Sequence, residues 1–81
     1  MKKVLVIVDV PVLHNQYEMM LPVFMQIGTL IFCITNAIEQ LTEGFFGSSG
    51  QEFLSTQSVI LDDTKTLIDY NVMNGDHLYL I

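Results

Sequence analysis

The stretch MMLPVFMQIGTLIFCITNAI, residues 19–38, runs for twenty consecutive positions without a charged side chain. An α-helix of about 20 residues is long enough to cross the roughly 30 Å hydrocarbon core of a bilayer. The stretch therefore allows two interpretations, a membrane span or the centre of a small folded domain. Its internal periodicity separates them.

The first part of the stretch belongs to a predicted β-strand. In YEMML, residues 17–21, the odd positions are aromatic or apolar and are separated by Glu18 and Met20. A period of two is typical of a strand with one buried face. Pro22 is expected to end the strand, because proline has no N–H to donate to the neighbouring strand.

The second part has the spacing of an amphipathic α-helix. Its aliphatic residues recur at steps of four, three, four and three, which places them on one helical face. The expected helix runs from about Thr29, a candidate N-cap, to Glu43, with Gly44 as the candidate C′ residue. The predicted buried stripe is Ile27, Ile31, Ile34, Ile38 and Leu41, with Leu30, Cys33 and Ala37 beside it and Thr35, Asn36, Glu39 and Glu43 toward water.

A membrane span over residues 19–38 is the less favoured interpretation. It would have to bury Pro22, Gln26 and Asn36 together with two threonines, and polar groups are expensive in hydrocarbon. The start of the chain does not resemble a secretory signal either, because the apolar run after the two lysines ends at Asp9. We therefore expect a cytoplasmic protein without direct membrane insertion.

Length and composition indicate one domain, residues 1–81, without covalent or metal staples. A chain of this size is near the lower limit for a single stable core. Cys33 is the sole cysteine, so it forms no intramolecular disulfide, and we expect it to be a small buried apolar residue. His14 and His77 belong to no ligand pattern, and we expect no metal or other cofactor.

The charge balance bears on the class of partner. Nine Asp and Glu stand against three Lys and no Arg, which gives a net charge of −6. Nucleic acid is therefore not an expected partner, since its phosphates require a basic face. Because 51% of the residues are apolar, some apolar side chains are expected on the surface or against another protein.

The remaining segments predict the order strand-strand-helix-strand-strand. Residues 3–10, KVLVIVDV, are rich in β-branched residues, and residues 11–16 connect them to the second strand as an irregular hairpin. Residues 53–61 predict a further strand, with a break near Gln57 and Ser58 that would leave a short extra strand at residues 59–61. The tight turn Asn74-Gly75-Asp76 leads into a last strand at residues 77–81.

Two connecting segments carry residues that invite a chemical interpretation. GFFGSSGQ, residues 44–51, is predicted to be a mobile loop, and it lacks the strand context and the Gly-Lys-Ser/Thr ending of a phosphate loop. Phe45 and Phe46 within it are expected to fold back under the helix end. The pair Asp62-Asp63 has no third ligand or histidine beside it, so we interpret it as a solvated turn.

The end of the chain, TLIDYNVMNGDHLYLI at residues 66–81, resembles the end of a ubiquitin-like domain. Ubiquitin also has Thr-Leu-x-Asp-Tyr-Asn and an aliphatic residue before a turn and a last strand. The resemblance implies that Leu67 and Val72 enter the core and that the Tyr70 hydroxyl bonds a backbone group. It implies an α+β fold of the ubiquitin-like β-grasp type, a mixed four- to five-stranded sheet packed on one α-helix.

The chain is also similar to the EsaB/YukD family. Members of that family are small cytosolic ubiquitin-like proteins of Gram-positive bacteria associated with type VII (ESX/Ess) secretion. The resemblance implies a non-conjugated accessory or regulatory protein that binds a protein partner, with a type VII secretion component as the implied partner. The residues that carry it are Leu21-Pro22, Phe24, Met25, Ile27, Leu30-Ile31, Leu67-Ile68-Asp69-Tyr70, Asn74-Gly75-Asp76 and Leu80-Ile81.

Other roles of a ubiquitin-like chain are weighed against this one. A stand-alone ubiquitin-like interaction module or homo-oligomer with no secretion role is the alternative. Conjugation or sulfur transfer is disfavoured, because those carriers use a flexible tail ending in Gly-Gly, whereas Ile81 directly follows Tyr79-Leu80 inside the predicted last strand. No set of nucleophile, base and oxyanion donors is evident, so we do not expect an enzyme.

The outward face of the predicted sheet is the candidate partner-binding surface. Alternation directs Val4, Val6, Val8 and Val10 toward the helix, together with Leu78 and Leu80. In this fold the first and last strands are neighbours, so the outward residues should gather on one face, with Ser55 across the last strand. The alternative is that these outward apolar residues only stabilise the sheet through cross-strand pairs and bind no partner. The candidate partner-binding residues are Leu5, Ile7, Met20, Tyr79 and Ile81.

Overall fold

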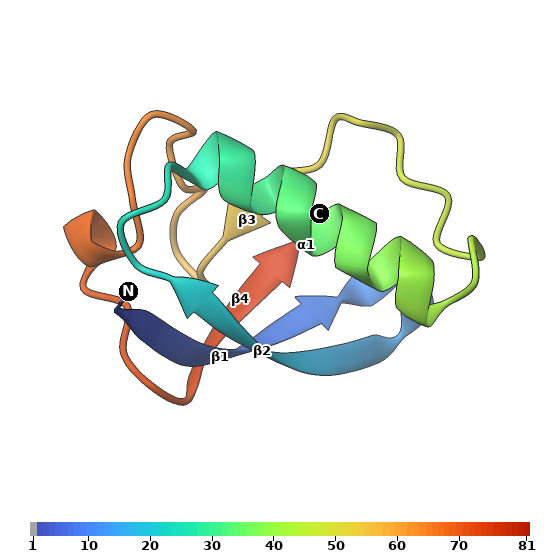
Figure 1. Ribbon diagram of the computed structural model, residues 1–81, viewed down its shortest axis with the longest axis horizontal. Coiled ribbons are helices and arrows are strands. Elements are labelled where there is room, and N and C mark those ends of the chain that lie inside the picture. The colour runs from blue at the N-terminus through green and yellow to red at the C-terminus, as the bar shows by residue number, and fades with distance from the viewer. Residues whose placement is uncertain (1) are drawn as a thin grey trace.

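The computed structural model describes residues 2–81 as one α-helix packed on one face of a four-stranded mixed sheet (Figure 1). The strand order is β2-β1-β4-β3, with β1 antiparallel to β2, parallel to β4, and β3 antiparallel to β4. The predicted fold class is therefore confirmed. The elements are β1 (Lys3–Val10), the 3-10 turn η1 (Pro11–Leu13), β2 (Asn15–Pro22), α1 (Ile27–Leu41), β3 (Leu54–Ser55), the 3-10 turn η2 (Ile68–Tyr70) and β4 (Asp76–Leu80).

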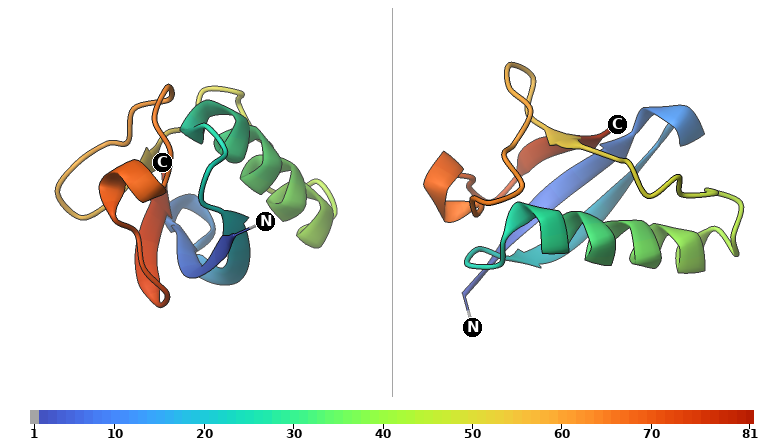
Figure 2. Two further views of the ribbon diagram at one scale, coloured as in Figure 1. Left: turned by 60° about the vertical axis from the view of Figure 1, so that its left-hand side comes forward. Right: turned by 90° about the horizontal axis from the view of Figure 1, so that it is seen from above.

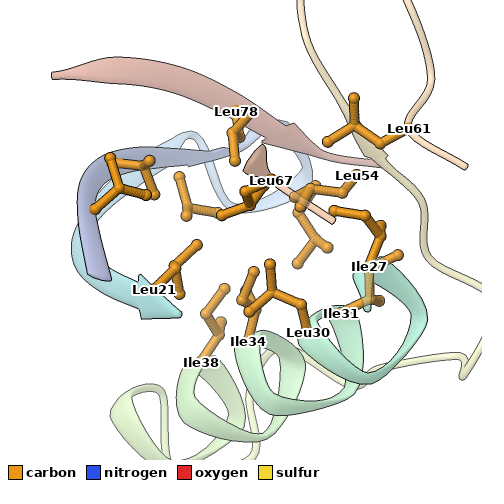
Figure 3. Packing of buried hydrophobic residues seen from close by; sticks show 14 of the residues in the cluster. Leu21, Ile27, Leu30, Ile31, Ile34, Ile38, Leu54, Leu61, Leu67 and Leu78 are labelled. Atoms are coloured by element: carbon orange, nitrogen blue, oxygen red, sulfur yellow. The ribbon is translucent and has the colours of Figure 1, made fainter. Parts of the chain in front are cut away.

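The core lies between the sheet and α1, and Figure 3 shows its side chains meeting from both layers. The inward directions predicted for the alternate residues of β1 and β4 are confirmed, because all of them are buried. Leu67, from the segment that precedes η2, is also fully buried, while Val72 packs against the core from its edge. The buried apolar residues of β1 and β4 are Val4, Val6, Val8, Val10, Leu78 and Leu80.

The helix begins and ends two residues earlier than predicted. Thr29 is not the N-cap, because the backbone N–H groups of Ile27 and Gly28 donate to the carbonyls of Lys65 and Asp63 at 2.8 and 3.0 Å. Backbone from a distant loop thus satisfies helix N–H groups that a side-chain cap usually satisfies. With α1 ending at Leu41, no helix in residues 2–81 is long and apolar enough to cross a bilayer.

The helix ends in a Schellman motif displaced from the predicted position. The N–H of Gly44 donates to the carbonyl of Glu39 at 2.7 Å, and the N–H of Glu43 to that of Gln40 at 3.2 Å, which is the bonding pattern of this motif. Glu43, rather than Gly44, is therefore the C′ residue, with φ of 53°.

Three residues of α1 face differently from their predictions. Leu41 is 64% exposed and Cys33 is exposed, although both were expected on the buried side. Thr35, predicted to face water, is buried, and its hydroxyl donates to the carbonyl of Phe32 at 3.0 Å. That hydrogen bond within the helix satisfies the hydroxyl and permits its burial.

The strand predicted over residues 53–61 is confined to the two residues of β3. The chain turns directly afterwards, with the N–H of Thr56 donating to the carbonyl of Val59 at 2.9 Å. Ile60 forms an isolated bridge to Ser55 in place of a fifth strand. The predicted break is correct, and the sheet has four strands.

The loop between α1 and β3 is organised by acidic side chains. The Glu39 carboxylate accepts the N–H of Gly47 at 2.7 Å, and the Glu52 carboxylate accepts both the N–H and the hydroxyl of Ser49 at 2.8 and 3.1 Å. Phe46 packs against the core as predicted, but Phe45 is 82% exposed, contrary to the prediction that both rings fold under the helix.

The segment that carries the sequence resemblance closes the fold. The Tyr70 hydroxyl accepts the backbone N–H of Asp62 at 2.9 Å, which confirms its predicted role. In the turn before β4, Gly75 has φ of 89°, a conformation that side chains other than glycine rarely adopt. The Asn74 side chain accepts the N–H of Leu5 at 2.8 Å and so joins this turn to β1.

Candidate protein-binding face

The outward face of the sheet is the surface opposite α1. Figure 1 and both views of Figure 2 show the helix on one side of the sheet only. Strands β1 and β2 supply most of this face, because their hairpin is eight residues long on each side. Its apolar side chains are thus placed where another protein can reach them.

Three of the five candidate residues gather at one end of this face. Leu5 and Met20 are directly opposite each other in the β1–β2 register, and Ile7 lies two positions along from Leu5. Met20 is 56% exposed and Leu5 37%, while Ile7 is half-buried between Glu18 on β2 and His77 on β4. We call Leu5, Ile7 and Met20 the apolar face.

A hydrogen-bonded pair borders the apolar face. The Nδ1 atom of His77 lies 2.9 Å from a carboxylate oxygen of Asp9, and these residues belong to adjacent parallel strands. The pair forms because the parallel register of β1 and β4, which is set by tertiary structure, brings Asp9 and His77 onto adjacent strands. The pair adds a polar border of the kind that surrounds apolar contact surfaces in protein complexes.

The remaining two candidate residues lie farther along β4. Tyr79 is half-buried and stands between Asp9 on β1 and Ser55 on β3, as predicted for Ser55. Ile81 is 53% exposed and exchanges backbone hydrogen bonds with Phe53 at 2.7 and 2.9 Å. Ile81 lines a different hollow, together with Val12 and Phe46, so it is separate from the apolar face.

The face combines aliphatic and polar side chains. Its exposed residues include the aliphatic Leu5 and Met20 and the charged Lys3 and Glu18. No group of three or more His, Cys, Asp and Glu among the described residues is arranged to hold a metal ion. Contiguous exposed apolar residues rimmed by polar ones mark protein interaction surfaces. The arrangement therefore favours contact with another protein.

Comparison with solved structures identifies the architecture. The chain superposes over its full length on the ubiquitin-like domain of the Mycobacterium tuberculosis type VII secretion protein EccD1, with a TM-score of 0.82, 18% identity and 99% of that chain covered. The fold is the ubiquitin-like β-grasp. The ubiquitin-like domain of EccD5 from Mycobacterium xenopi gives the same TM-score at 16% identity, with 100% of this chain and 94% of that chain covered.

A third similar structure is a chain of the MycP5-free ESX-5 inner membrane complex, with a TM-score of 0.82 and 16% identity. The superposition includes all of the present chain but only 21% of the longer chain in that complex. No family model and no curated protein matches the sequence. At these identities the similarity establishes the ubiquitin-like fold.

Proposed function

We propose that this chain is a non-conjugated ubiquitin-like accessory or regulatory protein of a Gram-positive type VII secretion system, of the EsaB/YukD kind. It acts in the cytoplasm by binding a protein partner, a component of the secretion system, through the outward face of its sheet. It performs no chemistry of its own.

The observation that carries the proposal is the full-length superposition on ubiquitin-like domains of type VII secretion proteins. One of the similar chains belongs to an inner membrane complex of such a system. The sequence motifs at Leu21-Pro22 and at Asn74-Gly75-Asp76 add an independent resemblance to the same secretion systems. Structure and sequence motifs thus support one biological setting.

The apolar face supports the proposed mode of action. Leu5 and Met20 form a cross-strand pair whose side chains are 37% and 56% exposed. Such a pair contributes to sheet stability, but that role does not require exposure to solvent. A partner that covers the pair would remove its apolar surface from water, which favours association. Tyr79, farther along β4, is proposed to extend the contact, and Ile81 to bind at its far end.

Affinity capture from the native cytosol and from solubilised membranes tests the proposal. The bait carries a tag on a flexible linker, and captured proteins are identified by mass spectrometry. The test variant is Met20→Lys, which places a charge on the apolar face at an exposed position. The matched control is Val59→Lys, because Val59 is 47% exposed and lies in the turn beyond β3.

We expect the wild type and Val59→Lys to enrich a type VII ATPase or membrane subunit. We expect Met20→Lys to recover at least tenfold less of that subunit. Recovery of the bait alone would contradict the secretion role and favour a self-associating module. Equal capture by all three proteins would contradict the apolar face as the contact surface. Circular dichroism establishes that each variant is folded.

A further inference from the structure

A cavity of about 350 Å³ opens at the end of the molecule where β1 begins. Figure 1 shows η2 and the start of β1 at this end, and Figure 2 (left) turns it toward the viewer. The cavity is lined by the buried residues Val4 and Val23 and by Ile68 and Met73, which are 41% and 69% exposed. Apolar surface is therefore accessible inside it.

The cavity also holds an unusual concentration of positive charge. Lys2 and Lys3 both line it, and the chain has only three lysines and no arginine at a net charge of −6. The third lysine, Lys65, lies near Asp62 and Asp69: hydrogen bonds from Thr64 and Thr66 chiefly lower the pKa of these carboxyls, and the charge of Lys65 lowers it further. Among residues 2–81, neither Lys2 nor Lys3 forms a salt bridge.

The other polar groups of the cavity are amides. Among residues 2–81, Asn71 and Asn74 line it and no carboxylate does. The carboxylate that follows in the chain, Asp76, accepts the N–H of Met73 at 2.8 Å. Since the Asn74 oxygen accepts the N–H of Leu5, its amide hydrogens are left to donate elsewhere. The cavity thus presents cations and hydrogen-bond donors above an apolar lining.

We infer that this lysine-rimmed cavity, formed by Lys2, Lys3, Val23, Ile68 and Met73, binds an acidic peptide segment of a partner protein. An Asp or Glu carboxylate of the segment pairs with the lysines, and an adjacent apolar side chain contacts Ile68 and Met73. The volume is at the lower end of the roughly 300–1,000 Å³ range of ligand sites, and it suits one or two side chains.

Charge distribution favours a peptide over an anionic lipid surface. A membrane presents a plane of negative charge to the whole domain, whose net charge of −6 is repelled by it. A single peptide carboxylate contacts the lysine rim alone, and the more distant carboxylates of the domain are screened by salt. The inference stands apart from the secretion role, since it rests on the cavity and not on the apolar face.

Selection from a phage library of random octapeptides tests the inference. The immobilised wild-type chain is compared with the double variant Lys2→Gln/Lys3→Gln and with Lys65→Gln as a matched lysine control outside the cavity. We expect enriched peptides to place Asp or Glu beside Leu or Phe. Relative to the wild type, we expect the recovery of these peptides to fall at least tenfold with the double variant and less than twofold with Lys65→Gln.

Amide and methyl NMR shifts then locate an enriched synthetic peptide on the labelled chain. Shifts at Val23, Ile68 and residues 71–74 are expected, with binding weakened by added salt and by Met73→Ser. No enrichment, enrichment of neutral peptides, or equal recovery by the double variant would overturn the inference. Stronger binding to phosphatidylglycerol vesicles than to any peptide would overturn the assignment to a protein segment.

Discussion

At the residue scale, the hydroxyl of Tyr70 joins two segments that the sheet itself does not hold together. It accepts the backbone N–H of Asp62 at 2.9 Å. Tyr70→Phe removes this acceptor and should lower the free energy of unfolding by about 0.5–1.5 kcal/mol, the net value of an ordinary hydrogen bond. Urea denaturation followed by circular dichroism measures the change.

Tyr79→Phe is the matched control for that measurement. Its hydroxyl lies 3.5 Å from the amide nitrogen of Gln57, a distance at which little hydrogen-bond energy is expected. The control should therefore change the stability by less than about 0.5 kcal/mol. Equal losses in the two variants would contradict a structural role specific to Tyr70.

The carboxylate of Asp69 should make the stability of the fold fall at acidic pH. Hydrogen bonds from the backbone N–H and hydroxyl of Thr66 to its carboxylate lower its pKa below the usual 3.8. Ionised Asp69 therefore stabilises the fold above pH 3.8, and this contribution is lost as the pH falls through the lowered pKa. Urea midpoints measured between about pH 6 and pH 2 should fall less steeply for Asp69→Asn than for the wild type.

Asp63→Asn is the control for this pH series, because the Asp63 carboxylate forms no hydrogen bond within residues 2–81. Its pH profile should parallel that of the wild type. An Asp69→Asn profile as steep as the wild type's would show that the Thr66 hydrogen bonds do not contribute to acid stability.

At the element scale, α1 contributes to the core through one face. Ile34 is 1% exposed and Leu41, seven residues later, is 64% exposed. Ile34→Ala should cost about 2–5 kcal/mol, since it leaves a cavity in a packed interior, whereas Leu41→Ala should cost less than about 0.5 kcal/mol. Thermal and urea unfolding of the pair measure the difference, and similar costs would contradict the burial described for this helix.

The periodicity of the sequence predicted the strands and the helix but not all of their limits. Alternation in β1 and β4 predicted their buried faces, because one residue in two must point to the core. The helix start was misplaced because its N–H groups bond to the carbonyls of Lys65 and Asp63, which are distant in the chain. Leu41 was assigned to the core because periodicity gives a side chain's direction but not how far the sheet beneath the helix extends.

The sequence predicted which residues point outward from the sheet, but only in part which of them lie together. Leu5, Ile7 and Met20 lie together because the hairpin register follows from local sequence. Ile81 lies apart because it follows the end of β4 and exchanges backbone hydrogen bonds with Phe53. Neither the His77–Asp9 pair nor the lysine-rimmed cavity has a signal in the sequence, since both depend on segments more than sixty residues apart.

At the scale of the whole molecule, two surface features of different chemistry lie on one small acidic domain. The apolar face offers aliphatic contact, and the lysine-rimmed cavity offers positive charge with an apolar lining. Met20→Lys and Lys2→Gln/Lys3→Gln therefore separate the two surfaces. Each substitution changes exposed side chains, so the fold should persist in both variants.

The most direct test of the proposed function is secretion itself. The gene is deleted from the bacterium that encodes the chain, and type VII substrates in the culture medium are quantified by immunoblot after complementation with the wild type, Met20→Lys or Val59→Lys at equal abundance. We predict that deletion stops secretion and that the wild type and Val59→Lys restore it. We predict that Met20→Lys restores less than a tenth of the wild-type level of secreted substrate. Undiminished secretion in the deletion strain would contradict the secretion role, and full rescue by Met20→Lys would contradict the apolar face as its binding surface.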